Sequence, residues 1–222
     1  TRACNLNCAY CYIPASSRIM RDVMPWDVLR STVTKLRDED LLEDQLTISW
    51  HGGEPLMAGI DWYREAFELI DAEISGAVDV VHVFQSNGVL LSDAWCRLLI
   101  DRQAHIGVSL DGSEEQSRFR VNWADRPAYA RAMGGVARLN NHGIPWSLLA
   151  VVTAGTMENP RDFIDFVRAS GCTTLCVKVE NTLAAHESTL DGEDHQTRMS
   201  NSSSGDLWKA LKLGDRPRVR EA

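Results

Sequence analysis

Apolar and polar residues alternate along this chain in two different rhythms. Apolar residues three or four positions apart predict amphipathic helices at residues 26–38, 62–74, 92–102, 127–141 and 160–169. Shorter apolar and β-branched runs predict strands at residues 46–50, 78–84, 106–110, 146–153 and 174–179. Helix and strand therefore alternate strictly, which is typical of parallel strands joined by right-handed crossover helices.

Local signals mark several of the predicted helix ends. Ser92 suits a helix N-cap, because its hydroxyl accepts a hydrogen bond from a free N–H of the first turn. Pro160 suits a first helical turn, and Gly143 and Gly171 follow two helices where glycine commonly ends one. These signals support the order of elements, but they leave a doubly wound open sheet and a partial barrel equally possible.

Residues 181–222 lack this periodicity and are rich in polar residues. We expect them to form a polar linker and a short tail, and residues 1–180 to form one domain. A sixth strand is expected before Thr1, because a cysteine motif begins at once. The chain is therefore expected to be a fragment of a longer protein.

Composition places the chain among ordinary globular proteins. Hydrophobic residues make up 44% and charged residues 24% of its 222 residues, so it can bury a sizeable core without metal or disulfide. The net charge of −8 argues against a nucleic-acid partner, which favours a basic surface. The longest apolar runs, such as residues 144–152, are too short to span a membrane, and residues 1–12 show no signal peptide. We expect neither a nucleic-acid nor a membrane partner.

Three of the six cysteines lie within eight residues, at Cys4, Cys8 and Cys11. A disulfide framework would spread paired cysteines along a short secreted chain. Clustered cysteines in a larger chain favour metal binding or redox chemistry and a cytoplasmic location. The other three are interpreted as packing residues: Cys96, Cys172 and Cys176.

The spacing C-x3-C-x2-C leaves three interpretations open. Three thiolates can hold three irons of a [4Fe–4S] cluster and leave the fourth iron free for another ligand. A structural zinc site needs four ligands, and His51 is the candidate for the fourth. A thioredoxin-like pair of Cys8 and Cys11 leaves Cys4 unexplained. The spacing favours the cluster.

Further motifs follow in register with the predicted strands. Gly52-Gly53-Glu54-Pro55 follows the first strand, Gln85-Ser86-Asn87-Gly88 the second, and Ser109-Leu110-Asp111-Gly112 the third. Together with the cysteine motif, they resemble the radical S-adenosylmethionine (SAM) superfamily over residues 1–179. Within it the chain resembles the SPASM-type peptide and protein maturases, which include anaerobic sulfatase-maturating enzymes and cyclophane-forming maturases.

The resemblance implies an α/β fold, a partial (βα)6 TIM-like barrel whose first strand is missing from this chain. It also implies a [4Fe–4S] cluster and SAM as cofactors. Reductive cleavage of SAM would give a 5′-deoxyadenosyl radical that modifies a side chain of a peptide or protein substrate. A one-electron donor such as flavodoxin or ferredoxin is expected as a partner.

Three alternatives remain beside this function. The chain could be a truncated or inactive cluster-binding fragment, because its tail lacks the further cysteines of the family's auxiliary-cluster domain. It could be a zinc-stabilised α/β scaffold. It could also be a radical SAM enzyme that acts on a small molecule.

The resemblance also implies roles for individual residues. Cys4, Cys8 and Cys11 would bind three irons, and SAM would chelate the fourth. The cofactor-binding residues would be Tyr12 near the adenine, Gly52, Gly53 and Glu54 near the methionine moiety, Asn87, Ser109 and Asp111 at the strand ends, and Arg120 at the carboxylate. No catalytic residue is identified.

Several of these roles have structural alternatives. Tyr12 could be a core tyrosine, Asp111 a simple turn residue, and Arg118 competes with Arg120 because the alignment there shifts by a residue. Gln116 and Ser117 stand where the family often has His-Asp. His51 stands where sulfatase-maturating relatives tend to carry Gln, and it could face substrate or be a hydrogen-bonded core histidine.

Overall fold

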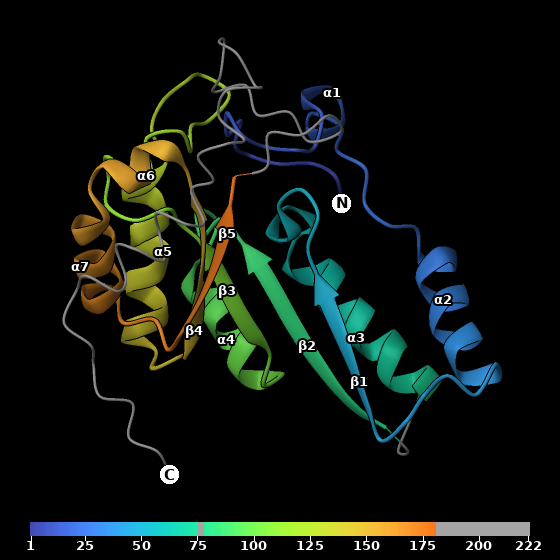
Figure 1. The fold of residues 1–222 in the computed structure, drawn as a ribbon. Coiled ribbons are helices and arrows are strands. Elements are labelled where there is room, and N and C mark those ends of the chain that lie inside the picture. Colours follow the sequence, from blue (N-terminus) through green and yellow to red (C-terminus); the bar gives the residue numbers. More distant parts are fainter. Residues whose placement is uncertain (75–77, 181–222) are drawn as a thin grey trace.

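The computed structural model describes residues 1–74 and 78–180, and in them one parallel sheet of five strands. The strands are β1 (Gln45–Trp50), β2 (Asp79–Ser86), β3 (His105–Ser109), β4 (Trp146–Val152) and β5 (Thr174–Val179). Each strand pairs with the next one along the chain. A doubly wound sheet reverses its strand order at a switch point, so that alternative is wrong. The sheet curls into part of a barrel (Figure 1), as the resemblance implied.

Helices cover the outer face of the curled sheet (Figure 1). The longer ones are α2 (Trp26–Asp38), α3 (Ile60–Ile74), α4 (Asp93–Asp101), α5 (Tyr129–Asn141) and α7 (Pro160–Ser170). All five were predicted, and their ends agree within two residues, as do those of the strands. The pattern missed the short helices α1 (Ala15–Arg18), η1 (Pro55–Ala58) and α6 (Ala154–Glu158). They are too short for hydrophobic periodicity to register.

The predicted helix ends are confirmed. The Ser92 hydroxyl accepts a hydrogen bond from the backbone N–H of Trp95, at 3.4 Å. Gly143 and Gly171 have φ angles of 65° and 82°, which few other residues adopt without strain. None of the described helices is long and apolar enough to cross a membrane. The predicted linker and tail at 181–222 lie outside the described residues.

Aromatic side chains fill the core between the sheet and α3 and α4. Trp50, Tyr63 and Phe84 meet edge to face or tilted, with Tyr63 and Phe84 ring centroids 4.9 Å apart. The buried His82 accepts a hydrogen bond from the Trp50 indole N–H at its Nδ1 atom, at 3.2 Å. Burial lowers the pKa of His82 to about 4, so this histidine is neutral in the core.

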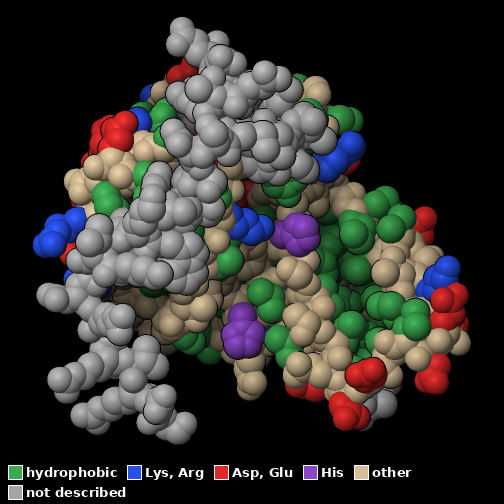
Figure 2. All heavy atoms as spheres, viewed as in Figure 1, with side chains coloured by type: hydrophobic (Ala, Val, Ile, Leu, Met, Phe, Trp, Pro, Cys, Tyr) green, Lys and Arg blue, Asp and Glu red, His purple; other side chains and the backbone are tan. Residues whose placement is uncertain are grey.

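The inner, concave face of the sheet carries the residues that alternate with this core. Strand pairing places Gln85 beside Gly107, and Ser109 two positions further along β3. Figure 2 looks onto this side, where uncharged polar groups and histidine side chains are visible between apolar ones. The chain's motifs lie at the carboxyl ends of the strands, which is where ligands bind in barrels of this kind.

Candidate active site

The cysteine loop lies over the carboxyl ends of the strands, close to α1 (Figure 1). Cys4, Cys8 and Cys11 are free thiols, each partly buried. Burial raises the pKa of the Cys4 thiol to about 12, and it raises the pKa of Cys8 as well. A metal that binds these sulfurs would displace their protons.

Donors from two directions surround the sulfur of Cys4. The backbone N–H of Leu6 donates to this Sγ at 3.4 Å, and the amide Nδ2 of Asn87 lies 3.9 Å from it. Asn87 Nδ2 also donates to Asn5 Oδ1 at 2.7 Å. The Nδ2 of Asn5 is buried without a hydrogen-bond partner in the described part of the chain. The structure thus brings the predicted Asn87 against the first cysteine.

The glycines after β1 allow a close approach of the chain's own N-terminal segment. A Cβ at Gly53 would lie 2.2 Å from the carbonyl oxygens of Arg2 and Ala3, and Gly52 has a φ of 130°. The N–H of Glu54 donates to the carbonyl oxygen of Ala3 at 2.7 Å. Glycine is therefore required here by backbone packing alone, and the expected contact with the methionine moiety stays a prediction.

Glu54 is a buried acid, with 1% of its surface exposed. Its Oε1 accepts hydrogen bonds from the Leu56 N–H at 3.0 Å and the Ser86 hydroxyl at 2.8 Å. Its Oε2 accepts one from the Asn87 N–H at 2.7 Å. Burial raises the pKa of Glu54 to about 7, against the opposing effect of these donors. A carboxylate offers about four acceptor positions, so one on Oε2 stays open.

Asp111 and Arg120 form a buried ion pair. Arg120 donates from Nε to Asp111 Oδ2 at 2.9 Å and from Nη2 to Oδ1 at 2.7 Å. The Val151 N–H donates to Oδ1 at 3.0 Å, and the Tyr10 hydroxyl donates to Oδ2. These four donors use the acceptor capacity of the carboxylate. Asp111 thus ties the cysteine loop to β3, β4 and the arginine, rather than forming a simple turn.

The geometry also separates the two candidate arginines. Arg118 is exposed and pairs with Glu115 on the surface, whereas the Arg120 side chain is only 9% exposed. Arg120 is therefore the buried one of the two, and its expected contact with the SAM carboxylate stays a prediction. Tyr10, which the sequence reasoning passed over, is a partly buried aromatic residue of the loop, and its ring centroid lies 5.5 Å from the Arg120 guanidinium. Its position between two cysteines was the available signal.

Ser109 faces the interior of the partial barrel together with Gln85. Gln85 Nε2 donates to Ser109 Oγ at 2.8 Å. A Cβ at Gly107 would lie 2.3 Å from Gln85 Oε1, so this glycine makes the room that Gln85 occupies. The expected contact of Ser109 with SAM stays a prediction.

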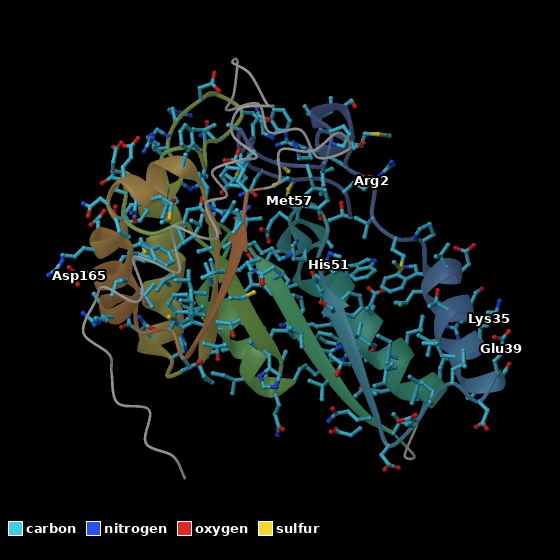
Figure 3. All side chains as sticks on the ribbon, viewed as in Figure 1. Arg2, Lys35, Glu39, His51, Met57 and Asp165 are labelled. Carbon is cyan, nitrogen blue, oxygen red and sulfur yellow. The ribbon has the colours of Figure 1, made fainter. Side chains whose placement is uncertain are left out.

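Two other expectations concern exposed residues. Tyr12 is 57% exposed, so the alternative of a core tyrosine is wrong. His51 is exposed at the carboxyl end of β1 (Figure 3), so the alternative of a core histidine is wrong as well. Their expected positions near adenine and near substrate stay predictions.

The three cysteines outside the loop differ in burial. Cys96 is fully buried in the core, which confirms its packing role. Cys172 is partly buried against the apolar core. Cys176 is exposed on β5, so the packing interpretation is wrong for this residue. Its pairing partner on the adjacent strand β4 is Leu149.

Among residues 1–74 and 78–180, no three His, Cys, Asp or Glu side chains converge on a point where one ion could bind. A mononuclear zinc site needs such convergence, because all its ligands bind the same ion. In a cubane cluster each thiolate binds a different iron, so the sulfurs stay further apart. The three thiols therefore do not meet the requirement of a mononuclear zinc site in the described part of the chain.

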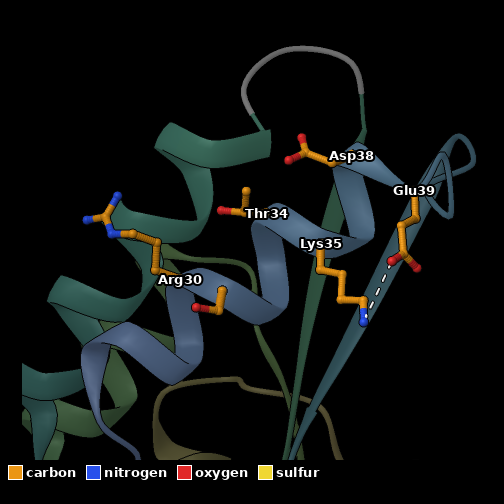
Figure 4. Close-up of a pocket in the computed structure, with 6 residues that line it drawn as sticks. Arg30, Thr34, Lys35, Asp38 and Glu39 are labelled. Carbon is orange, nitrogen blue, oxygen red and sulfur yellow. Dashed lines mark ion pairs between the residues drawn. The ribbon is translucent and has the colours of Figure 1, made fainter.

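A shallow depression on α2 lies away from this site (Figure 4). Its lining residues are Arg30, Ser31, Thr34, Lys35, Asp38 and Glu39. Lys35 and Glu39 form an exposed ion pair across one helical turn. The depression is a solvated helix face, and it brings together none of the residues of the motifs.

The partial barrel and the cysteine loop define a class of protein. The model of the Radical SAM superfamily matches residues 1–169, most of the chain. The chain belongs to this superfamily.

Particular relatives narrow the resemblance. The chain is 32% identical to an uncharacterised protein of Synechocystis over 82% of this chain and 46% of the relative. It is 32% identical to a serine-type anaerobic sulfatase-maturating enzyme of Bacteroides thetaiotaomicron over 76% of this chain and 42% of the relative. The chain thus spans less than half of the length of these relatives.

Solved structures share the fold. Native anSMEcpe with bound AdoMet superposes with a TM-score of 0.75 at 21% identity, covering 82% of this chain and 50% of that one. Streptococcus suis SuiB bound to its precursor peptide SuiA superposes with a TM-score of 0.61 at 17% identity, covering 95% of this chain and 45% of that one. The partial barrel is therefore shared with one protein solved with bound AdoMet and with another solved with a bound precursor peptide.

Proposed function

We propose that this chain is the core of a radical SAM enzyme that modifies a side chain of a peptide or protein. The observation that carries the proposal is the loop of three free thiols over the strand ends, with N–H donors directed at the sulfur of Cys4. The sulfatase-maturating relatives and the peptide-bound SuiB support a peptide substrate.

The residues of the loop fit a [4Fe–4S] cluster. Cys4, Cys8 and Cys11 would bind three irons, and the fourth would be open to the amino and carboxylate groups of SAM. The buried Nδ2 of Asn5, next to Cys4 in the chain, has no hydrogen-bond partner in the described residues. A sulfur atom of the cluster would accept a hydrogen bond from it. When bound, the cluster supplies an electron to the sulfonium of SAM, whose C5′–S bond breaks to give methionine and a radical able to remove a hydrogen atom from substrate.

The chain's own residues would bind and orient SAM around this loop. Glu54 keeps an acceptor position on Oε2 for the SAM ammonium, a charge-assisted contact. Arg120 would face the SAM carboxylate while Asp111 holds it in place. Ser109 and Asn87 are polar groups at the strand ends, and the ring of Tyr12, which is 57% exposed, would stack on adenine. Gly52 and Gly53 would lie near the methionine moiety, beside the N-terminal segment that packs against them.

A one-electron donor such as flavodoxin or ferredoxin would reduce the cluster before each turnover. SAM cleavage distinguishes this function from that of an inactive fragment. We would reconstitute the chain anaerobically with iron and sulfide, add SAM and dithionite, and measure 5′-deoxyadenosine. Cys8→Ala should abolish the product, whereas Cys172→Ala, outside the loop, should retain it. A chain that binds a cluster but yields no product in any variant would be a binding fragment and not an enzyme.

A further inference from the structure

Arg18, at the end of α1, is a buried arginine with no carboxylate partner in the described chain. Its exposed fraction is 6%, and none of the ion pairs among residues 1–74 and 78–180 includes it. Arg120, the other buried arginine near the loop, is neutralised by Asp111. A buried guanidinium without a counter-ion destabilises a fold, so its presence here needs a physical explanation.

The guanidinium of Arg18 holds both halves of the cysteine loop. Its Nη1 donates to the carbonyl oxygen of Leu6, between the first two cysteines, at 3.1 Å. Its Nε donates to the carbonyl oxygen of Ile13, beyond the third cysteine, at 2.9 Å. Its own carbonyl oxygen accepts a hydrogen bond from the N–H of Cys4 at 2.9 Å. The arginine therefore closes the loop around the three thiols.

Trp123 covers the outer side of this arrangement. The Arg18 guanidinium lies 5.3 Å from the centroid of the Trp123 ring, within the range of a cation–π contact. The Trp123 indole N–H donates to the carbonyl oxygen of Cys4 at 2.8 Å. These contacts hold the positive charge on the loop and keep it from swinging into solvent.

The charge acts on the thiols that the loop carries. The guanidinium is fixed to the backbone on either side of Cys8 and Cys11, through the carbonyl oxygens of Leu6 and Ile13. Three cysteines bound to iron as thiolates would bring negative charge into the same loop. Reduction of a cluster there would add one more negative charge, and a fixed cation nearby favours the reduced form.

We propose that Arg18 is the built-in counter-charge of the iron–sulfur cluster and a positioning residue that makes the cluster easier to reduce. This inference rests on the proposed function, because it requires that the loop bind a cluster. Arg18 would act through its positive charge and through its hydrogen bonds to the loop. Separate variants are needed to tell these two contributions apart.

The test is the midpoint potential of the reconstituted chain, measured by redox titration with electron paramagnetic resonance (EPR) and without SAM. Arg18→Met removes the charge at similar length, Arg18→Lys keeps the charge but loses the planar fork, and Arg64→Met removes an exposed arginine on α3. We expect Arg18→Met to lose at least tenfold in the reduced-to-oxidised ratio at a fixed potential, a shift of about 59 mV to more negative values. Arg18→Lys should shift less, and Arg64→Met not at all.

An Arg18→Met cluster at the wild-type potential would overturn the proposal. Equal shifts in Arg18→Met and Arg18→Lys would also overturn it, because the charge would then not be the cause. If Arg18→Met binds no cluster, Arg18→Lys decides the question. A cluster in Arg18→Lys with a midpoint potential near that of the wild type supports the proposal. A tenfold change in its reduced-to-oxidised ratio, or no cluster, overturns the proposal. A wild-type chain that binds no cluster would contradict the proposed function instead.

Discussion

Removal of the Asp111 charge should destabilise this protein far more than removal of a surface charge. In Asp111→Asn the bidentate guanidinium of Arg120 stays buried without its counter-ion, and the introduced amide cannot accept all four donors. Breaking a buried ion pair in this way costs about 3–5 kcal/mol. A surface pair such as Arg118 and Glu115, whose acid is 79% exposed, contributes about 0–1 kcal/mol. Glu115→Ala is therefore the matched control.

The assay is urea unfolding of the metal-free chain, followed by the fluorescence of its seven tryptophans. The free energy of unfolding should fall by about 3–5 kcal/mol in Asp111→Asn and by less than about 1 kcal/mol in Glu115→Ala. The double variant Asp111→Asn/Arg120→Met should lose less than the sum of its single variants, because neither charge is then left alone. A loss below about 1 kcal/mol in Asp111→Asn, or strict additivity in the double variant, would refute the account of a buried, mutually dependent pair.

Two further predictions concern the turn after β1. Since burial raises the pKa of Glu54 from 4.5 to about 7, the folded protein keeps a proton that the unfolded chain has lost between these pH values. The free energy of unfolding of the wild type, relative to Glu54→Gln, should therefore fall by about 3 kcal/mol as the pH rises through this window. The comparison with Glu54→Gln is needed because His82, whose pKa is lowered, gives a slope of the opposite sign, and parallel curves would contradict the prediction. Gly53→Ala should displace the N-terminal segment, whose carbonyl oxygens would lie 2.2 Å from the new Cβ, and lower the iron bound on reconstitution at least severalfold. Gly134→Ala in α5 is the control, because the nearest atom would be 3.6 Å from the new Cβ. It should retain the bound iron, and its free energy of unfolding should rise by about 0.5–1 kcal/mol. Equal amounts of bound iron in both variants would count against the packing argument.

The sheet and its long helices were predictable because their side chains follow regular periods. Strand β4 alternates between buried and partly buried side chains, and α5 repeats its apolar residues every three or four positions. Periodicity could not decide between a barrel and a doubly wound sheet, because both satisfy the same pattern. That decision depends on which strands pair, and the structure pairs each strand with the next.

The motif residues were predictable as a group, but their mutual contacts were not. The loop around the cysteines has no period, so the sequence could not tell that Tyr10 is partly buried and Tyr12 exposed. The pairing of Asp111 with Arg120 depends on how the intervening loop turns back. Arg18 belongs to none of the motifs, and only the folded loop places it against the backbone of Leu6 and Ile13. Such contacts arise from tertiary structure and leave no pattern in the chain.

The most direct test of the central claim is the EPR spectrum of the reconstituted, reduced chain with and without SAM. The account predicts about four irons and four sulfides per chain and a reduced-cluster signal whose g values change when SAM is added, because SAM would bind the iron that Cys4, Cys8 and Cys11 leave open. Zinc without sulfide, or a cluster signal that SAM leaves unchanged, would contradict it.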